Sequence, residues 1–486
     1  MTVDRPDHRA IERAIWGPER RALTIGLAIN VVASAFEALA VATVLPGVVR
    51  DIGGLELYGW AFSAYLLSSL VGIALAGAAT DARGPALPLV AGTALFAVGL
   101  AISGMAASMP VVVAGRFIQG FGSGAISAIG YAAIGRAYPV DARPRMLALL
   151  SSAWVVPGLI GPALAGLVSD HLGWRWVFLG IAPLVVLGTA LSIRPLVRLA
   201  SGPGEDLTDE PSAVPAGSGS GGILPPLALA GGAALLLAAL RTPAQPAWGM
   251  AALGLVLALP ALHRLLPAGT LRLRRGTPAA VALMGAIGFA FFAAEAFLPL
   301  ALSSVRGLGA SAAGLPLTAG TLCWTVGSWI QAREAHHRGR RELAASGVLL
   351  VALGIALASA TLRASVPVAF ATAGWAIAGL GIGIAYSTTA LVILETPGPD
   401  AGSASAALQL AWTLGIALGT GLGGALVAAA AAAGRSTAVG IALVDATALA
   451  ALVGGLVAAG RLPGRVRHAG VPGSSAGPGT VRSLDR

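Results

Sequence analysis

Residues 22–46 read ALTIGLAINVVASAFEALAVATVLP, an apolar run that contains a single ionisable residue, Glu37. A helix needs about 20 mostly apolar residues to cross the hydrocarbon core of a bilayer. This run is long enough to do so, and we interpret it as an uncleaved first membrane helix.

Similar apolar runs continue along the chain, which is 56% hydrophobic and only 11% charged. A soluble domain is about a quarter charged, so water is an unsuitable solvent for this chain and lipid is a suitable one. We therefore predict an all-α polytopic membrane protein with 14 transmembrane helices. The predicted runs are 22–46, 57–80, 86–108, 110–135, 144–169, 175–194, 223–240, 247–266, 277–304, 311–331, 343–362, 366–393, 402–430 and 436–459.

The runs group as six helices, a linker, two extra helices and six more helices. Two six-helix halves around a central site are typical of transporters built from repeats. The linker is rich in Gly, Ser, Pro and acids, a composition that cannot bury a core. The predicted segments are a cytoplasmic N-terminal segment 1–21, a first half 22–194, a flexible cytoplasmic linker 195–222, two inserted helices 223–266, a second half 277–459 and a disordered cytoplasmic tail 460–486.

The net charge of +10 comes from 31 basic residues, all of them Arg. In a soluble protein this excess would suggest nucleic acid, but here the Arg residues lie in short loops, where they meet lipid headgroups. A cytoplasmic N-terminus places roughly four Arg inside for each one outside. We expect a multi-pass protein of the plasma or inner membrane, with both termini cytoplasmic and no nucleic-acid partner.

Several short motifs occur in a fixed order along the first half. Glu37 precedes the Leu45-Pro46 pair in the first run, and Trp60-x4-Tyr65 lies in the second. The loop after the second run carries Gly77, Asp81 and Gly84. The fourth run contains Arg116-Phe-Ile-Gln119-Gly120-Phe-Gly122, and the fifth contains Gly158-x-x-Gly161-Pro162-x-x-Ala-Gly166.

In these motifs the chain resembles the major facilitator superfamily, and within it the fourteen-helix drug:proton antiporter branch. The resemblance implies the two-half fold, roles for Glu37 and Arg116 in proton coupling, and a monomeric protein. It also implies that two groups of residues act in the conformational change: Gly77, Asp81 and Gly84 in the loop, and Gly158, Gly161, Pro162 and Gly166 in the fifth helix.

A charge at bilayer depth costs roughly 2.5–3.5 kcal/mol, so ionisable residues within the runs are candidates for function. Desolvation disfavours the carboxylate of Glu37, which suits a group that loads and releases a proton. Asn30 and Ser34 fall on the same helix face, and we expect this stripe to line a cavity. Arg116 cannot lose its charge and must meet a carboxylate, a carbonyl or water. Gln119, one turn on, is a further candidate for the substrate cavity.

In the second half, Glu295 lies among Phe289, Phe291, Phe292 and Phe297, an environment that suits an apolar cation. Gln409 is a further candidate for the substrate cavity, and Asp445 is a further polar candidate within the runs. No P-loop, zinc spacing or dinucleotide fingerprint appears in a plausible context, so we expect no metal, no cofactor and no enzymatic activity.

The function that these observations favour is proton-coupled export of hydrophobic small molecules, cationic ones among them, by alternating access, as in multidrug antiporters. Three alternatives remain open at this stage. The chain could export one dedicated metabolite, such as an antibiotic or a siderophore. It could import a nutrient with protons, or it could be a membrane scaffold or lipid-handling protein that transports nothing.

Overall fold

A computed structural model describes residues 8–201, 222–242, 244–335, 337–394 and 401–463. The described part of the chain is helical apart from short turns and contains no β-strand. The predicted linker 195–222 and tail 460–486 lie largely outside the described residues.

The first half begins with a short helix that the apolar runs did not predict, α1, within the segment expected to precede the membrane. The helices of the first half are α1 (His8–Trp16), α2 (Arg21–Ile52), α3 (Tyr58–Arg83), α4 (Ala86–Gly104), α5 (Met109–Ala137), α6 (Arg143–Ser152), α7 (Val155–Leu172) and α8 (Arg175–Ser201).

The second half and the inserted pair complete the chain. The inserted helices are α9 (Leu224–Ala239) and α10 (Ala244–Leu265). The second half comprises α11 (Thr277–Leu300), a π-helical turn η4 (Ala301–Val305), α12 (Ala310–Glu334), α13 (Arg340–Ala360), α14 (Ala369–Leu394), α15 (Ala401–Ala432) and α16 (Thr437–Ala459).

Twelve helical segments of the described chain are long and apolar enough to cross a membrane. The two others among the fourteen predicted are α9, which is apolar but has only 16 residues, and α12, which has 25. Large apolar side chains cover the outer faces of α4, α8 and α10, as Leu95, Leu187 and Val256 illustrate. Such a surface is stable in lipid rather than in water.

The fifth predicted run, 144–169, is two helices rather than one. The break between α6 and α7 falls at residues 153–154. Pro157 explains it, because its ring clashes with the carbonyl four residues earlier and it has no N–H to donate.

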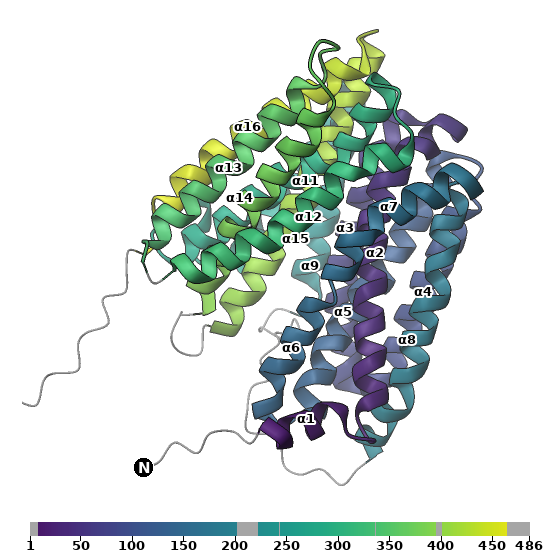
Figure 1. The fold of residues 1–486 in the computed structure, drawn as a ribbon, viewed down its shortest axis with the longest axis vertical. Helices are drawn as coiled ribbons and strands as arrows, with labels where there is room; N and C mark the ends of the chain where they lie inside the picture. Colours follow the sequence, from purple (N-terminus) through teal and green to yellow (C-terminus); the bar gives the residue numbers. More distant parts are fainter. Residues whose placement is uncertain (1–7, 202–221, 243, 336, 395–400, 464–486) are drawn as a thin grey trace, which may run out of the picture.

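The two halves meet at one end of the molecule and separate toward the end that carries α1 (Figure 1). Two helix pairs make most of the contacts between them, α3 with α15 and α7 with α12. The Tyr58 hydroxyl donates to the Ala296 carbonyl at 2.9 Å, and the Ser63 hydroxyl donates to the Ala417 carbonyl at 2.8 Å. We call this end the closed end.

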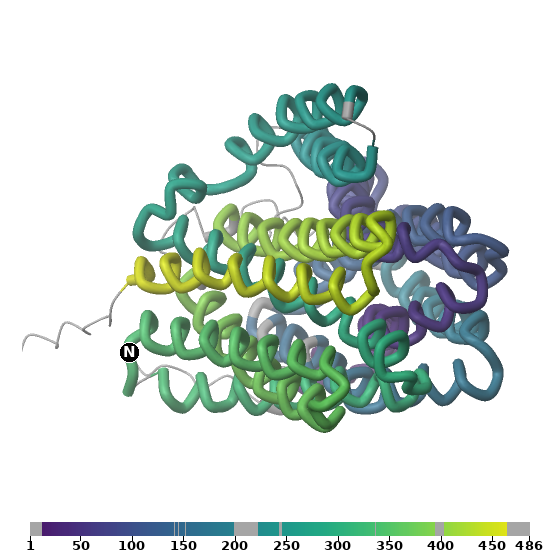
Figure 2. Tube along the Cα trace, turned by 90° about the horizontal axis from the view of Figure 1, so that it is seen from above, coloured from purple at the N-terminus to yellow at the C-terminus, as the bar shows by residue number. Residues whose placement is uncertain are grey.

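The inserted helices α9 and α10 pack against each other at the edge of the molecule (Figure 2). Leu229 and Leu237 of α9 share a buried apolar cluster with Leu67 of α3 and Leu414 of α15. The pair therefore lies across the junction of the two halves. Beside it is an apolar groove of about 570 Å³, and Phe289 of α11 is one of the residues that line it.

Candidate proton and substrate sites

Glu37 and Arg116 form a buried ion pair between α2 and α5. Arg116 donates from Nη1 to Glu37 Oε1, and the two residues are 2% and 0% exposed, Arg116 first. The prediction that Arg116 must meet a carboxylate, a carbonyl or water is confirmed. A buried pair of this kind is stable only while both partners are present, because either charge alone would be uncompensated.

Three further groups hold the guanidinium of Arg116. Its Nε donates to the Ala61 carbonyl of α3 at 2.9 Å, and Nη1 also donates to Gln119 Oε1 at 2.8 Å. The guanidinium carbon lies 4.1 Å from the centre of the Tyr65 ring, a cation–π distance. Arg116 thus ties α5 to both α2 and α3, and its position depends on all three helices.

The packing of α5 explains why Arg116 reaches these partners. Gly120 lies one turn beyond it, where a Cβ atom would overlap the Tyr65 carbonyl oxygen and the Ser68 hydroxyl. Glycine therefore allows the backbones of α3 and α5 to approach closely. The R-x-x-Q-G-x-G motif combines the charged group with the small residue that brings the neighbouring helix to it.

Two polar atoms of this cluster lack a partner in the described structure. They are Glu37 Oε2, an acceptor, and Gln119 Nε2, a donor. Buried polar groups normally find partners, and exceptions often mark functional sites. Glu37 Oε2 is therefore left without a donor while Oε1 accepts from Arg116.

The three residues of the predicted polar stripe on α2 lie in different environments. The Asn30 amide is buried against α8, where Nδ2 donates to Thr189 Oγ1 at 3.5 Å. Ser34 is half-buried. Of the residues on the stripe, Glu37 is the one that meets Arg116, whereas Asn30, two turns earlier on the same face, packs against α8.

A second candidate site surrounds Glu295 in α11. Its side chain is 9% exposed, and the Trp375 indole donates to Glu295 Oε2 at 3.3 Å. The ring of Trp375 is 4.9 Å from that of Phe291, which begins a continuous aromatic cluster. The cluster consists of Phe291, Phe292, Trp324, Trp375, Tyr386 and Trp412.

Sequence reasoning found only the α11 members of this cluster. Phe291 and Phe292 belong to it, whereas Phe297 packs against Tyr58 at the closed end. The tryptophans and Tyr386 come from α12, α14 and α15, and no spacing in the sequence connects them.

The α7 residues that were predicted to act in the conformational change contact helices of both halves. Cβ atoms at Gly158 and Gly166 would overlap Thr321 and Ser311 of α12, so these glycines permit close packing between the halves. Gly161 faces Phe36 of α2 at ordinary contact distance. Pro162 lies within α7, beside Gly314 of α12.

The residues of the first-loop motif, Gly77, Asp81 and Gly84, lie at the end of α3 that is far from the closed end. Asp81 is in the last turn of α3, not in the loop where the motif predicted it, and its carboxylate is 3.6 Å from Arg136 of α5. Gly84 ends α3 with a φ of 75°, which glycine adopts without strain. Gly77 is buried within α3.

Gln409, the last predicted cavity residue, is exposed on α15 and belongs to neither cluster. Among the described residues, no group of three or more His, Cys, Asp or Glu side chains could hold a metal ion.

Comparison with known proteins agrees with this architecture. The family model of the Major Facilitator Superfamily matches residues 27–420. A Mycobacterium tuberculosis protein named "Probable multidrug-efflux transporter" is 31% identical over 356 residues, which cover 69% of this chain and 71% of that one. An Aspergillus aculeatus protein named "Acurin A biosynthesis cluster MFS-type transporter" is 34% identical over 32% of this chain and 28% of its own.

Solved structures support the fold alone, because sequence identity to them is low. A D-xylose-proton symporter superposes with a TM-score of 0.61 at 14% identity, covering 91% of this chain and 98% of that one. An auto-inhibited POT family peptide transporter gives 0.63 at 16% identity, covering 90% and 97%. This multi-pass membrane protein belongs to the Major Facilitator Superfamily of transporters.

Proposed function

We propose that this transporter exports hydrophobic, cationic small molecules in exchange for protons, by alternating access of its two halves. The observation that carries the proposal is the buried Glu37–Arg116 pair. The "multidrug-efflux" name of the mycobacterial relative supports the substrate class and the direction of transport.

The proton step follows from the charges of the pair. Arg116 keeps its charge under all conditions, so the state of Glu37 decides whether the cluster is neutral or positive. Protonation of Glu37 would leave Arg116 without its counter-ion in a site that is closed to water, which is costly. The helices that carry the pair, α2 and α5, would then gain stability by moving Arg116 toward another acceptor, and this gain drives the change of state.

The aromatic cluster supports the substrate class. Glu295 offers a negative charge, and Trp324, Tyr386 and Trp412 are only partly buried and offer ring faces. An organic cation gains from both interactions. The apolar groove is lined in part by Phe289 of the same helix, which suits compounds that dissolve in the membrane.

The driving force differs between substrates of different charge. A proton that moves down about 100 mV and one pH unit releases about 3.7 kcal/mol, which sustains on the order of a 500-fold gradient of a neutral substrate. A monovalent cation exchanged for one proton moves no net charge, so the pH difference alone sustains about a tenfold gradient.

The proposal includes the remaining expectations from the sequence. The protein acts as a monomer in the plasma or inner membrane, with both termini cytoplasmic and its Arg-rich loops against lipid headgroups. On this topology, the closed end faces outward and the structure corresponds to a state that is closed to the outside.

The test is transport by the full chain in proteoliposomes, with tetraphenylphosphonium as the hydrophobic cation and an imposed pH gradient. The wild type is expected to move the cation against its gradient and to lose this activity in Glu37→Gln. Glu334→Gln is the matched control, because Glu334 lies in an exposed pair with Arg338. Pumping by Glu37→Gln with a wild-type pH profile would refute the proton assignment.

One observation favours a second candidate, the export of a single metabolite. The fungal relative is named for a biosynthesis cluster, although it matches only part of each chain. A drug-susceptibility panel in an efflux-deficient host separates the two candidates. A multidrug exporter protects against several unrelated hydrophobic compounds, and a dedicated exporter protects against one structural class at most.

A further inference from the structure

Asp445 is a buried acid that the proposed mechanism does not use. It lies about two turns into α16, is 7% exposed and is the only ionisable residue of that helix. No ion pair forms at Asp445 in the described structure. A carboxylate without a counter-ion is costly at bilayer depth, and the residue can lower this cost by binding a proton.

The elements packed against α16 supply no cation to neutralise Asp445. In the described residues α15 has no ionisable side chain, and Glu295 is the only one in α11. The charged residues of α13 lie at its start, about 25 Å along the helix axis from Ser359.

The remaining charges near this end lie in turns and loops. Arg306, which follows η4, donates to the backbone carbonyls of Thr361, Arg363 and Val366. Arg363 and Arg435 themselves lie in the loops before α14 and α16. None of these three guanidinium groups pairs with Asp445 in the described structure.

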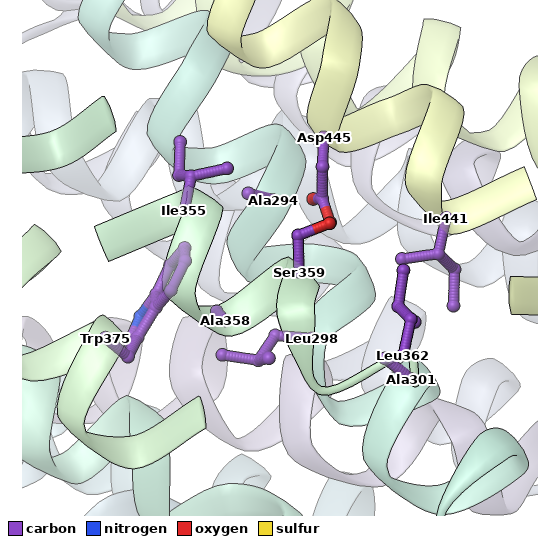
Figure 3. Close-up of a pocket in the computed structure, with 10 residues that line it drawn as sticks. All are labelled: Ala294, Leu298, Ala301, Ile355, Ala358, Ser359, Leu362, Trp375, Ile441 and Asp445. Atoms are coloured by element: carbon purple, nitrogen blue, oxygen red, sulfur yellow. The ribbon is translucent and has the colours of Figure 1, made fainter. Parts of the chain in front are cut away.

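Asp445 opens into a small internal cavity near the closed end (Figure 3). The Ser359 side chain of α13 points toward the carboxylate, and apolar residues form most of the remaining wall. The volume open to the centre of a water molecule is about 10 Å³. This is the lower limit for one water, and Asp445 and Ser359 provide the two polar partners that such a water needs.

The same cavity adjoins the Glu295 site. Ala294, the residue before Glu295, and Trp375 both line it. The Trp375 indole donates to Glu295 and also lines the cavity, so one aromatic side chain contacts both environments. Two carboxyl groups that lie near each other in a medium of low dielectric constant influence each other's charge.

We propose that Asp445 and Ser359 form a second proton-binding site, coupled to Glu295 across Trp375. The pair then shares protons, because a charge on one acid disfavours a charge on the other. A cation bound at Glu295 offsets that repulsion and allows Asp445 to release its proton to solvent. This last step rests on the proposed function, whereas proton binding at Asp445 does not.

The test detects proton binding to carboxyl groups and does not depend on transport. Infrared difference spectra of the full purified chain in lipid nanodiscs, taken between mildly acidic and mildly alkaline pH, report carboxyl groups that change protonation. Exposed carboxyls stay ionised in this range. Asp445→Asn is expected to lose one carboxyl band, and Ser359→Ala is expected to shift the frequency of that band. Asp141→Asn, a change at an exposed acid, serves as the matched control and should leave the band unchanged.

Each outcome decides one part of the proposal. A spectrum of Asp445→Asn identical to that of the wild type would overturn proton binding at Asp445. If Asp445→Asn does not fold, an unshifted band in Ser359→Ala would overturn it instead. Glu295→Gln should change the pH at which the Asp445 band disappears, and an unchanged pH would refute the coupling. Tetraphenylphosphonium transport by the wild type, measured separately, shows whether the exporter function itself fails.

Discussion

Asp170 at the end of α7 caps the first turn of α12 in the other half. Its carboxylate accepts hydrogen bonds from the Ser311 hydroxyl at 2.6 Å and from the Ser311 amide at 3.1 Å, with a third from the Ala310 amide. A carboxylate at a helix N-terminus satisfies free N–H groups and interacts favourably with the helix dipole. Here the cap comes from the opposite half, so opening the closed end must break it.

Asp170→Asn should therefore favour the state in which the closed end is open. Loss of a charged cap costs about 1 kcal/mol, which corresponds to a roughly fivefold shift in the equilibrium. The measurement uses Thr43→Cys in a Cys323→Ser background, because Thr43 is 1% exposed and contacts α12 beside Gly314. An impermeant maleimide added from the closed end should label the Asp170→Asn variant several times faster.

Asp51→Asn is the control for this experiment. Asp51 bonds Trp174 and Arg175 near the same end of the molecule, but all of these residues belong to the first half. Its loss should leave the labelling rate unchanged. Equal labelling of all three proteins would show that the Asp170 cap does not contribute to closure.

The Glu37–Arg116 pair predicts a non-additive effect on stability. Arg116→Gln leaves Glu37 buried without a counter-ion, which should lower the free energy of unfolding by about 3–5 kcal/mol. Glu37→Gln leaves Arg116 without its counter-ion and should be destabilising in the same way. The double variant removes both charges and should be more stable than either single variant. Thermal unfolding of the four proteins in detergent gives the coupling energy, and simple additivity would show that the two side chains do not interact.

The positions of the helices followed from the sequence because one physical demand determines them. Every backbone polar group must be satisfied within lipid, so each long apolar run becomes a helix, as α2 and α16 illustrate. The break between α6 and α7, which the single run 144–169 did not predict, has a local cause in the missing N–H of Pro157. The short amphipathic helix α1 was missed because its composition resembles that of a solvated segment.

Long-range contacts were much harder to predict. The motif residues Arg116 and Glu37 were expected to act together, yet nothing in the sequence showed that Ala61 and Tyr65 hold the guanidinium. Asn30 was placed on the Glu37 stripe from helical periodicity. That periodicity gives the angle of a side chain on its own helix, but it does not tell which neighbouring helix packs there.

Trp412 provides a test of the aromatic site. It packs against Phe292, Trp324 and Tyr386, and it is partly buried. Trp412→Ala should weaken tetraphenylphosphonium binding roughly tenfold, whereas Trp412→Phe keeps a ring face and should lose less. Trp329→Ala, an exposed tryptophan of α12, controls for general loss of aromatic surface. Equal affinities of the Trp412→Ala and Trp329→Ala proteins would exclude the cluster as the cation site.

Gly120 tests whether close packing of α3 and α5 positions Arg116. Gly120→Ala forces the added methyl group against the Tyr65 carbonyl, and overpacking of this kind costs about 1–3 kcal/mol. The variant should unfold at lower temperature and should also lose transport, since separation of the helices moves Ala61 away from Arg116. Gly180→Ala adds the same methyl group to α8 where no atom lies within 4 Å, and it should be neutral or slightly stabilising. If Gly120→Ala lost stability but kept full coupled transport, the exact spacing of α3 and α5 would matter for folding and not for the proton step.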